Sequence, residues 1–164
     1  MRCVIALIFL VSSVALGQEA KSSFLPGIDF SKYHSYQWVT KRPHPNPDVD
    51  AAIKASVDSQ LTARGLTKSD TNSDLTLDYR VAMSQREQWS SFGQMEMESR
   101  SPHTETVYFG TLGIDITDPK LNRIVWTGIV AKAVDPKSSA TKKEKNLDKA
   151  VQKLLKDFPP GRAQ

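Results

Sequence analysis

The chain has 164 residues, of which 39% are hydrophobic and 24% charged, and its formal net charge is +4 at pH 7. This composition is ordinary for a globular protein and argues against wholesale disorder, and the mild positive excess does not by itself indicate nucleic-acid binding. The one cysteine, Cys3, lies in an N-terminal segment that we expect to be removed. The mature chain would then have no disulfide, cysteine nucleophile or thiolate metal site.

Residues 1–17 have the pattern of a secretory signal peptide. Arg2 supplies a positive start, and an apolar run of about 13 residues follows, against the roughly 20 needed for a membrane-spanning helix. Ala15 and Gly17 are the small residues that a signal peptidase reads. We expect cleavage before Gln18 and a periplasmic or secreted protein. It would not be a lipoprotein, because the first mature position is not a cysteine.

Residues 18–164 suit a single domain, which begins with a predicted strand and a predicted helix. Residues 28–39 read as the strand, and the prolines of residues 41–47 end it. The helix that follows can be capped by Asp48 or Asp50. It carries an apolar stripe made by Val49, Ile53, Val57 and Leu61. Gly65 and Leu66 predict a Schellman-type end.

The rest of the chain predicts three strands and a second helix. Residues 75–83 alternate apolar and polar side chains, and residues 106–117 and 124–134 form two further strands. Trp126 is expected in the core of the last one. Residues 141–158 form an amphipathic helix that ends at two prolines. The order β-α-β-β-β-α predicts an α+β fold, with a mixed or antiparallel sheet of about four strands and both helices on one face.

Candidate catalytic groups are few. No two of His34, His44 and His103 have the close spacing of a metal site, so we interpret them as surface or strand-edge residues. Asp115 and Asp118 could form an acid–base pair of a small hydrolase, but only if a pocket separates their pKa values. The structural interpretation, an outward-facing strand residue and a turn opener, is favoured. We therefore predict no catalytic, metal or cofactor-binding residues.

A polar segment at residues 84–105 separates two predicted strands. It contains apolar side chains without a strand or helix period, namely Trp89, Phe92, Met95 and Met97. A loop of this length in a compact domain is usually functional or disordered, and exposed aromatic and methionine side chains suit adaptable binding surfaces. The segment is either a partner-binding loop or a hairpin extension whose rings fold back on the sheet.

The last helix carries a lysine face opposite its apolar face. That lysine face consists of Lys142, Lys145, Lys149, Lys153 and Lys156. From Lys132 to the end there are nine basic and four acidic residues. Such a face could dock peripherally on an anionic membrane or an acidic partner, although lysines opposite an apolar face are usually the solvated side of a helix.

Short motifs along the chain resemble those of a bacterial envelope family known as domain of unknown function 4136. They are Asp29-Phe30 with Tyr33, Tyr36 and Trp38; Leu61-x-x-Arg64-Gly65-Leu66; Ser73-Asp74-Leu75; Gly110-x-x-Gly113-Ile-Asp115-Ile; Val125-Trp126-Thr-Gly128; and Phe158-Pro-Pro160. The resemblance implies an exported α+β domain of no established activity, often a lipoprotein. This chain departs from the family by lacking the lipid-bearing cysteine. Its residues 84–105 also contain more glutamate, serine and methionine than the glycine- and aromatic-rich segment of its relatives.

The function that these observations favour is a non-catalytic binding module of the cell envelope. We expect its partner to be an envelope protein or another envelope component, not nucleic acid, and any membrane contact to be peripheral. No cofactor is predicted. The sequence does not determine the identity of the partner or the oligomeric state.

Overall fold

The computed structural model describes residues 19–89 and 104–158. The predicted signal peptide and the side chains of Phe92, Met95, Met97 and His103 lie outside these residues. The elements are β1 (Glu19–Phe24), the 3-10 helix η1 (Phe30–Lys32), β2 (Ser35–Trp38), α1 (Pro47–Thr62), β3 (Thr67–Lys68), β4 (Leu75–Trp89), β5 (Thr104–Asp118), β6 (Arg123–Val134) and α2 (Ala140–Leu154).

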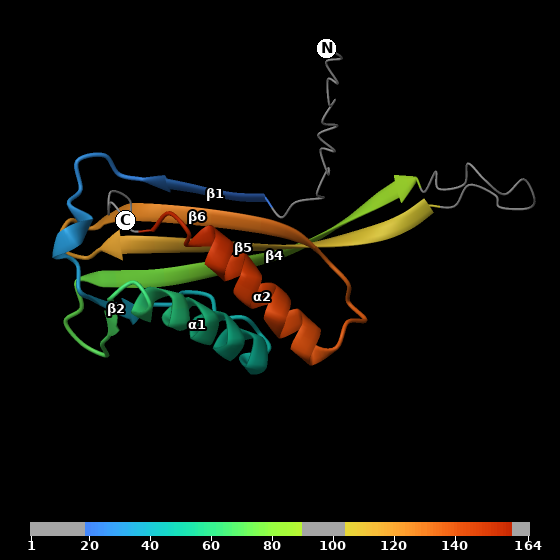
Figure 1. Cartoon of the computed structure of the whole chain (residues 1–164), viewed down its shortest axis with the longest axis horizontal. Coiled ribbons are helices and arrows are strands. Elements are labelled where there is room, and N and C mark those ends of the chain that lie inside the picture. The colour runs from blue at the N-terminus through green and yellow to red at the C-terminus, as the bar shows by residue number, and fades with distance from the viewer. Residues whose placement is uncertain (1–18, 90–103, 159–164) are drawn as a thin grey trace, which may run out of the picture.

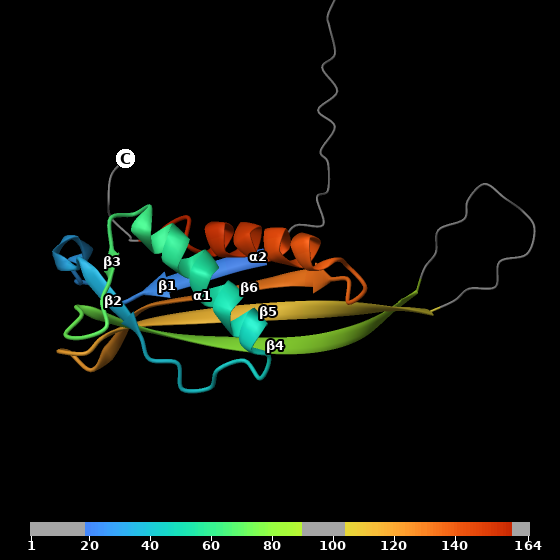
Figure 2. The ribbon, with the colours of Figure 1, turned by 90° about the horizontal axis from the view of Figure 1, so that it is seen from below.

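The strands form one mixed sheet in the order β1-β6-β5-β4-β2-β3. The pairs β1–β6, β6–β5 and β5–β4 are antiparallel, whereas β2 pairs parallel with both β4 and β3. Figure 2 shows both α-helices on the same face of the sheet. The predicted α+β class and the mixed sheet with two helices on one face are confirmed.

The sheet has six strands where the sequence predicts about four. The two extra strands, β1 and β3, have no hydrophobic alternation: five of the six β1 side chains are exposed, and both β3 side chains are exposed. Strands at the edges of a sheet bury little side-chain surface, so the period of apolar residues that identifies a strand is missing from them. Their hydrogen bonds are made by the backbone, which the sequence pattern does not report.

The first predicted strand, residues 28–39, is wrong in its first half. Asp29 accepts a hydrogen bond from the Ser31 backbone N–H at 3.0 Å and caps η1. Only residues from Ser35 onward form β2. An aspartate followed by a serine favours a local side-chain-to-backbone turn, and here that turn replaces the sheet ladder.

The N-cap of α1 lies two residues before Asp48, the first of the two predicted caps. Asn46, and not Asp48 or Asp50, is the N-cap, since its side chain accepts from the backbone N–H of Asp48 at 2.9 Å, with Pro47 at the first helical position. The predicted Schellman end is confirmed: Leu66 N–H donates to the Leu61 carbonyl at 3.1 Å, and Gly65 has φ +85°.

The helix α2 begins after its cap Ser139 and ends at Leu154, four residues before the predicted end, because residues 155–158 tighten into turns. Phe158 nevertheless stays buried and contacts Trp126 edge-on at 5.3 Å between ring centroids. Trp126 is 1% exposed, and β6 lies between β1 and β5, as predicted for a core residue of an inner strand. Among the described residues, no helix is both long and apolar enough to cross a membrane.

Candidate functional site

The most distinctive surface is the far end of the β4–β5 ladder, where both strands run past the helices (Figure 1). We call residues 84–89 of β4 with residues 104–109 of β5 the arm. Ser84 pairs with Phe109 at its base, and the ladder continues to the pair of Trp89 and Thr104. Arg86 lies over the ring of Phe109, with 5.3 Å between the guanidinium carbon and the ring centroid. The arm therefore consists of paired backbone, and its β4 side chains from Ser84 to Glu87 are exposed.

The exposure of β4 changes along the strand. Leu75, Leu77 and Tyr79 are at most 1% exposed, whereas Val81 is 43% and Met83 is 66% exposed on the same face. Every β4 side chain from 81 to 87 is exposed. The sequence predicts a buried apolar face as far as Met83, and this is wrong for Val81 and Met83 because the helices do not reach them.

The backbone of β4 also has a free edge. β2 pairs with it only from Leu75 to Leu77. The segment after β2 contacts β4 side chains, since the Lys41 N–H donates to the Asp78 carboxylate at 3.3 Å and the His44 N–H to the Tyr79 hydroxyl at 2.8 Å. From position 80 onward, no described strand pairs with this edge. The Leu77 carbonyl accepts from Val39 N–H on the β2 side. Since backbone groups alternate along a strand, those of Val81, Met83, Gln85 and Glu87 point away from β5.

The sequence reasoning missed this free edge. The one sequence signal for it is a change of residue type on one face of β4. Gln85 and Glu87 lie on the same face as Val81 and Met83 but are polar. Such a change marks the point at which a strand leaves the core. Of the predicted partner-binding residues, Trp89 ends β4, and Phe92, Met95 and Met97 lie outside the described residues. The ends of the 84–105 segment are paired strand.

Three aromatic residues of the motifs in the first half of the chain, the buried Tyr33 and Tyr36 and the partly buried Trp38, donate hydrogen bonds to aspartates. The Tyr33 hydroxyl donates to Asp118 at 2.8 Å, and Tyr36 and Trp38 both donate to Asp58, at 2.9 and 2.8 Å. Burial, together with these aspartate acceptors, raises the pKa of both tyrosines well above its usual value. Neutral, hydrogen-bonded tyrosines of this kind hold elements together and offer no free acid or base.

Three further motif residues, Asp74, Arg64 and Gly128, also have structural roles. Asp74 accepts from the backbone N–H groups of His34 and Ser35, at 3.0 and 3.1 Å, and so joins β4 to β2. Arg64 donates to the Phe158 carbonyl at 2.8 Å. A Cβ added at Gly128 would lie 2.3 Å from the Trp126 ring, so only glycine fits there.

The two carboxylates of the hydrolase hypothesis are not brought together. Asp118 is 4% exposed and shares the helix-covered face with Ile116 and Ile114, whereas Asp115 lies on the opposite face. Asp115 accepts from Thr127 Oγ1 at 2.6 Å and pairs with Arg80 at 3.0 Å. Residues three apart in a strand project to opposite faces, so these carboxylates do not form an acid–base pair.

The hydrogen bonds of Asp118 indicate a turn-forming residue. Although burial opposes ionisation, donation from the Tyr33 hydroxyl and from the backbone N–H groups of Leu121 and Lys120 keeps the pKa of Asp118 below its usual value. Elsewhere, the His34 backbone donates to Asp74, and the His44 ring nitrogen Nδ1 hydrogen-bonds with the backbone of Asn46. The described residues contain no group of three or more histidines, cysteines, aspartates or glutamates that could hold a metal ion.

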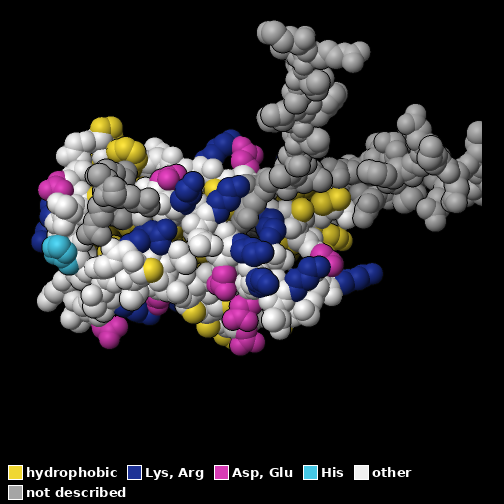
Figure 3. Space-filling view, in the orientation of Figure 1, with side chains coloured by type: hydrophobic (Ala, Val, Ile, Leu, Met, Phe, Trp, Pro, Cys, Tyr) yellow, Lys and Arg dark blue, Asp and Glu magenta, His cyan; other side chains and the backbone are white. Residues whose placement is uncertain are grey.

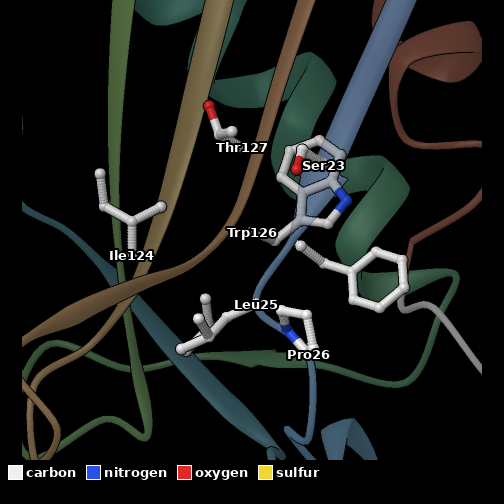
Figure 4. A pocket seen from close by; sticks show the side chains of 8 residues that line it. Ser23, Leu25, Pro26, Ile124, Trp126 and Thr127 are labelled. Carbon is white, nitrogen blue, oxygen red and sulfur yellow. The ribbon is translucent and has the colours of Figure 1, made fainter.

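One shallow pocket of about 210 Å³ lies between β1 and β6 (Figure 4). Its lining consists of Ser23, Phe24, Leu25, Pro26, Ile124, Val125, Trp126 and Thr127. None of these side chains titrates, so the pocket offers no acid–base chemistry.

The lysine face of α2 is exposed along its whole length, and Figure 3 shows Lys and Arg side chains gathered over this helix. The structure places Lys142, Lys145, Lys149 and Lys153 of α2, and Lys156 in the turn just after it, on the solvent side, while Val151, Leu154 and Leu155 are buried beneath. Acidic residues Glu144 and Asp148 are interspersed.

A family model described as a domain of unknown function (DUF4136) matches residues 20–160, which is nearly the whole described chain. The chain belongs to this family, as its motifs predict. No sequence among curated proteins matches it.

Solved structures share the fold. A PDZ domain protein from Parabacteroides distasonis matches with a TM-score of 0.61 at 16% identity over 88% of this chain, which spans only 36% of that protein. The PelC dodecamer from Paraburkholderia phytofirmans matches with a TM-score of 0.54 at 10% identity, covering 85% of this chain and 95% of that one. At such identities the likeness is one of fold and carries no function with it.

Proposed function

We propose that this member of the DUF4136 family is an exported, non-catalytic interaction module of the bacterial cell envelope, and that the β4–β5 arm is its contact element. The observation that carries the proposal is the exposure of every β4 side chain from 81 to 87. A strand pair that leaves its own core gains little stability from its side chains. The export signal of residues 1–17 and the apolar residues Trp89, Phe92, Met95 and Met97 at and beyond the end of β4 support the proposal.

The use of this fold in an assembly is a second support. The PelC protein, whose structure matches at a TM-score of 0.54, is described as a dodecamer. A sheet that is covered by helices on one face only leaves its other face and its edges available for contacts between molecules. We propose that the present chain also acts through contacts of this kind.

The test is a shortened-arm variant in which Asn-Gly replaces residues 85–108. The alternation makes Ser84 and Phe109 a hydrogen-bonded pair, which a two-residue turn can close. Cross-linking in living cells followed by affinity purification should recover an envelope component with the intact chain and lose it with the variant. Its thermal midpoint should stay within a few degrees of that of the intact protein, because the removed side chains with described burial are exposed or half-buried.

The matched control is Leu121→Ala, an exposed apolar residue in the turn between β5 and β6, at the other end of the sheet. This variant should capture the same component as the intact chain. Capture that survives loss of the arm, or a shortened variant that does not fold, would contradict the proposal.

A second candidate function is peripheral docking on an anionic membrane through the lysine face of α2, favoured by the exposure of all five lysines. Each lysine near an anionic surface contributes about 1 kcal/mol. Changing all five to glutamine should abolish co-sedimentation with phosphatidylglycerol vesicles at physiological salt. The charge-matched control neutralises exposed cations outside α2, namely Lys21, Lys41, Arg42, Lys120 and Arg123, and should still bind. Equal binding by both variants would reject this function.

A further inference from the structure

The sheet has a second open edge, on the outer side of β1. Leu25 N–H donates to the Val125 carbonyl at 2.9 Å, so the odd-numbered backbone groups of this segment face β6. Those of Ala20, Ser22 and Phe24 therefore point away from the sheet. No described strand pairs with this side of β1. Within residues 19–89 and 104–158, one molecule thus presents backbone donors and acceptors that no strand pairs on two opposite edges, β1 and the part of β4 from position 80 onward.

The directions of the two edge strands allow an antiparallel contact between copies. β1, β6, β5 and β4 are antiparallel at each step, so β1 and β4 run in opposite directions. A second copy placed beside the first, in the same orientation, brings its β1 antiparallel to β4. The outward groups of β1 belong to residues on the helix-covered face, as do those of β4. In this contact the outward backbone groups of the two strands can therefore bond to each other, while the side chains of both strands keep to the same faces of the joined sheet.

One register also matches charge and apolar surface. With Ser22 opposite Met83, Phe24 lies opposite Val81, and Glu19 lies opposite Arg86. Phe24 is 52% exposed and Met83 66% exposed in the single chain. Opposite charges and apolar pairs that face each other across antiparallel strands stabilise a sheet.

The neighbouring registers match less well. A shift of two residues toward the tip of the arm places Lys21 opposite Arg86, which is a like-charge pair. A shift the other way removes the carboxylate of Glu19 from Arg86 and moves Phe24 opposite Tyr79, whose hydroxyl already accepts from the His44 N–H and donates to Asp50.

We infer that β1 of one copy pairs antiparallel with the free edge of β4 of a second copy, with Ser22 opposite Met83, so that copies join head to tail in one continuous sheet. This inference rests on the proposed function and names a second copy of the chain as a partner of the β4 edge. Since Phe24 is level with Leu77 within one molecule and with Val81 across the contact, each copy is displaced by four residues, about 13 Å. Such a heterologous contact builds a ring or a filament.

Cysteine pairing tests the register directly. In a Cys3→Ser background, purified Ser22→Cys protein is mixed with Met83→Cys protein under mild oxidation. Paired Cα atoms about 5.5 Å apart lie within the range that a disulfide spans. We expect a disulfide-linked dimer from the mixture and none from either variant alone.

The register controls combine Ser22→Cys with Val81→Cys or with Gln85→Cys, which should link less efficiently. Absence of a dimer with all three partners would overturn the inference. Met83→Cys linking mainly to itself would also overturn it, because it would indicate a two-fold contact between β4 edges.

A second variant blocks the contact without disturbing β5. Met83→Pro removes a backbone N–H that points to the free edge, where proline is tolerated. Sedimentation should show concentration-dependent assembly of the intact protein and a monomer for Met83→Pro with an unchanged circular dichroism spectrum. Arg86→Glu should weaken assembly several-fold, and the double variant with Glu19→Arg should restore it.

The outcome can be separated from that of the proposed function. An intact protein that stays monomeric at high concentration while its arm still captures another envelope component in cells would overturn the head-to-tail contact alone. Assembly of the purified intact protein that Met83→Pro leaves unchanged would likewise overturn it.

Discussion

The same two strands, β4 and β5, pass through two regions of the molecule that differ in almost every respect. Under the helices, Leu77, Tyr79 and Ile116 are at most 1% exposed. From Val81 to Glu87, where the strand passes into the arm, the β4 side chains are all exposed. The family motifs and the proposed interaction surface therefore lie in separate places, since the motifs serve the covered region and the free edge lies beyond it.

The largest expected effect is a loss of unfolding free energy from a substitution under the helices, where the same kind of substitution in the exposed region has little effect. Trp126→Ala removes a side chain that is 1% exposed and packs against Phe158, and should cost about 3–5 kcal/mol of unfolding free energy. Met83→Ala, at 66% exposure, should change the unfolding free energy by less than about 0.5 kcal/mol. Urea unfolding followed by circular dichroism measures both. Equal losses in the two variants would remove the distinction between the regions.

A smaller effect separates two motif glycines. A Cβ at Gly128 would lie 2.3 Å from the Trp126 ring and 2.8 Å from Leu154, whereas a Cβ at Gly113 meets nothing closer than 3.8 Å. Gly128→Ala should therefore cost about 1–3 kcal/mol by overpacking, and Gly113→Ala should be tolerated. Thermal unfolding of the two variants checks the order. The reverse order would show that the ring packing around Gly128 is misplaced.

The smallest effect concerns acid stability. The backbone N–H of His34 donates to Asp74 and, together with Ser35, lowers the pKa of that carboxyl despite partial burial. A carboxylate with a lowered folded pKa stabilises the fold above its unfolded pKa and loses that contribution as the pH falls through the folded pKa. We expect stability to decline below about pH 4, and Asp74→Asn to flatten part of the decline. The exposed Asp70→Asn is the control and should leave the profile unchanged.

The elements that bury an apolar face could be predicted from the sequence, because burial imposes a period. The stripe of Ile53, Val57 and Leu61 and the alternation of Leu75 and Leu77 identify α1 and the first part of β4. The family membership follows from motifs that turn out to hold turns, caps and ring contacts. The spacing of these motifs matters because their residues contact particular partners elsewhere in the fold, as Asp74 contacts the backbone of residues 34 and 35.

The free edges could not be predicted, for a physical reason. β1 has one partly buried side chain and owes its place to backbone hydrogen bonds with β6. How far the helices cover β4 depends on where α1 and α2 lie in space. Met83 is therefore exposed although it lies on the same face of the strand as the buried Leu77. Pairing between edges depends on strand order, and no local pattern reports strand order.

Hydrogen exchange of single β4 amides, measured in dilute and in concentrated protein, tests the division of the molecule most directly. The amides of Ala82 and Ser84 face β5 and should be protected at both concentrations. Those of Val81, Met83 and Gln85 face the free edge and should exchange rapidly in dilute protein, then become protected when β1 of a second copy covers them. Rapid exchange at both concentrations would contradict the head-to-tail contact, and protection at both would contradict the free edge itself.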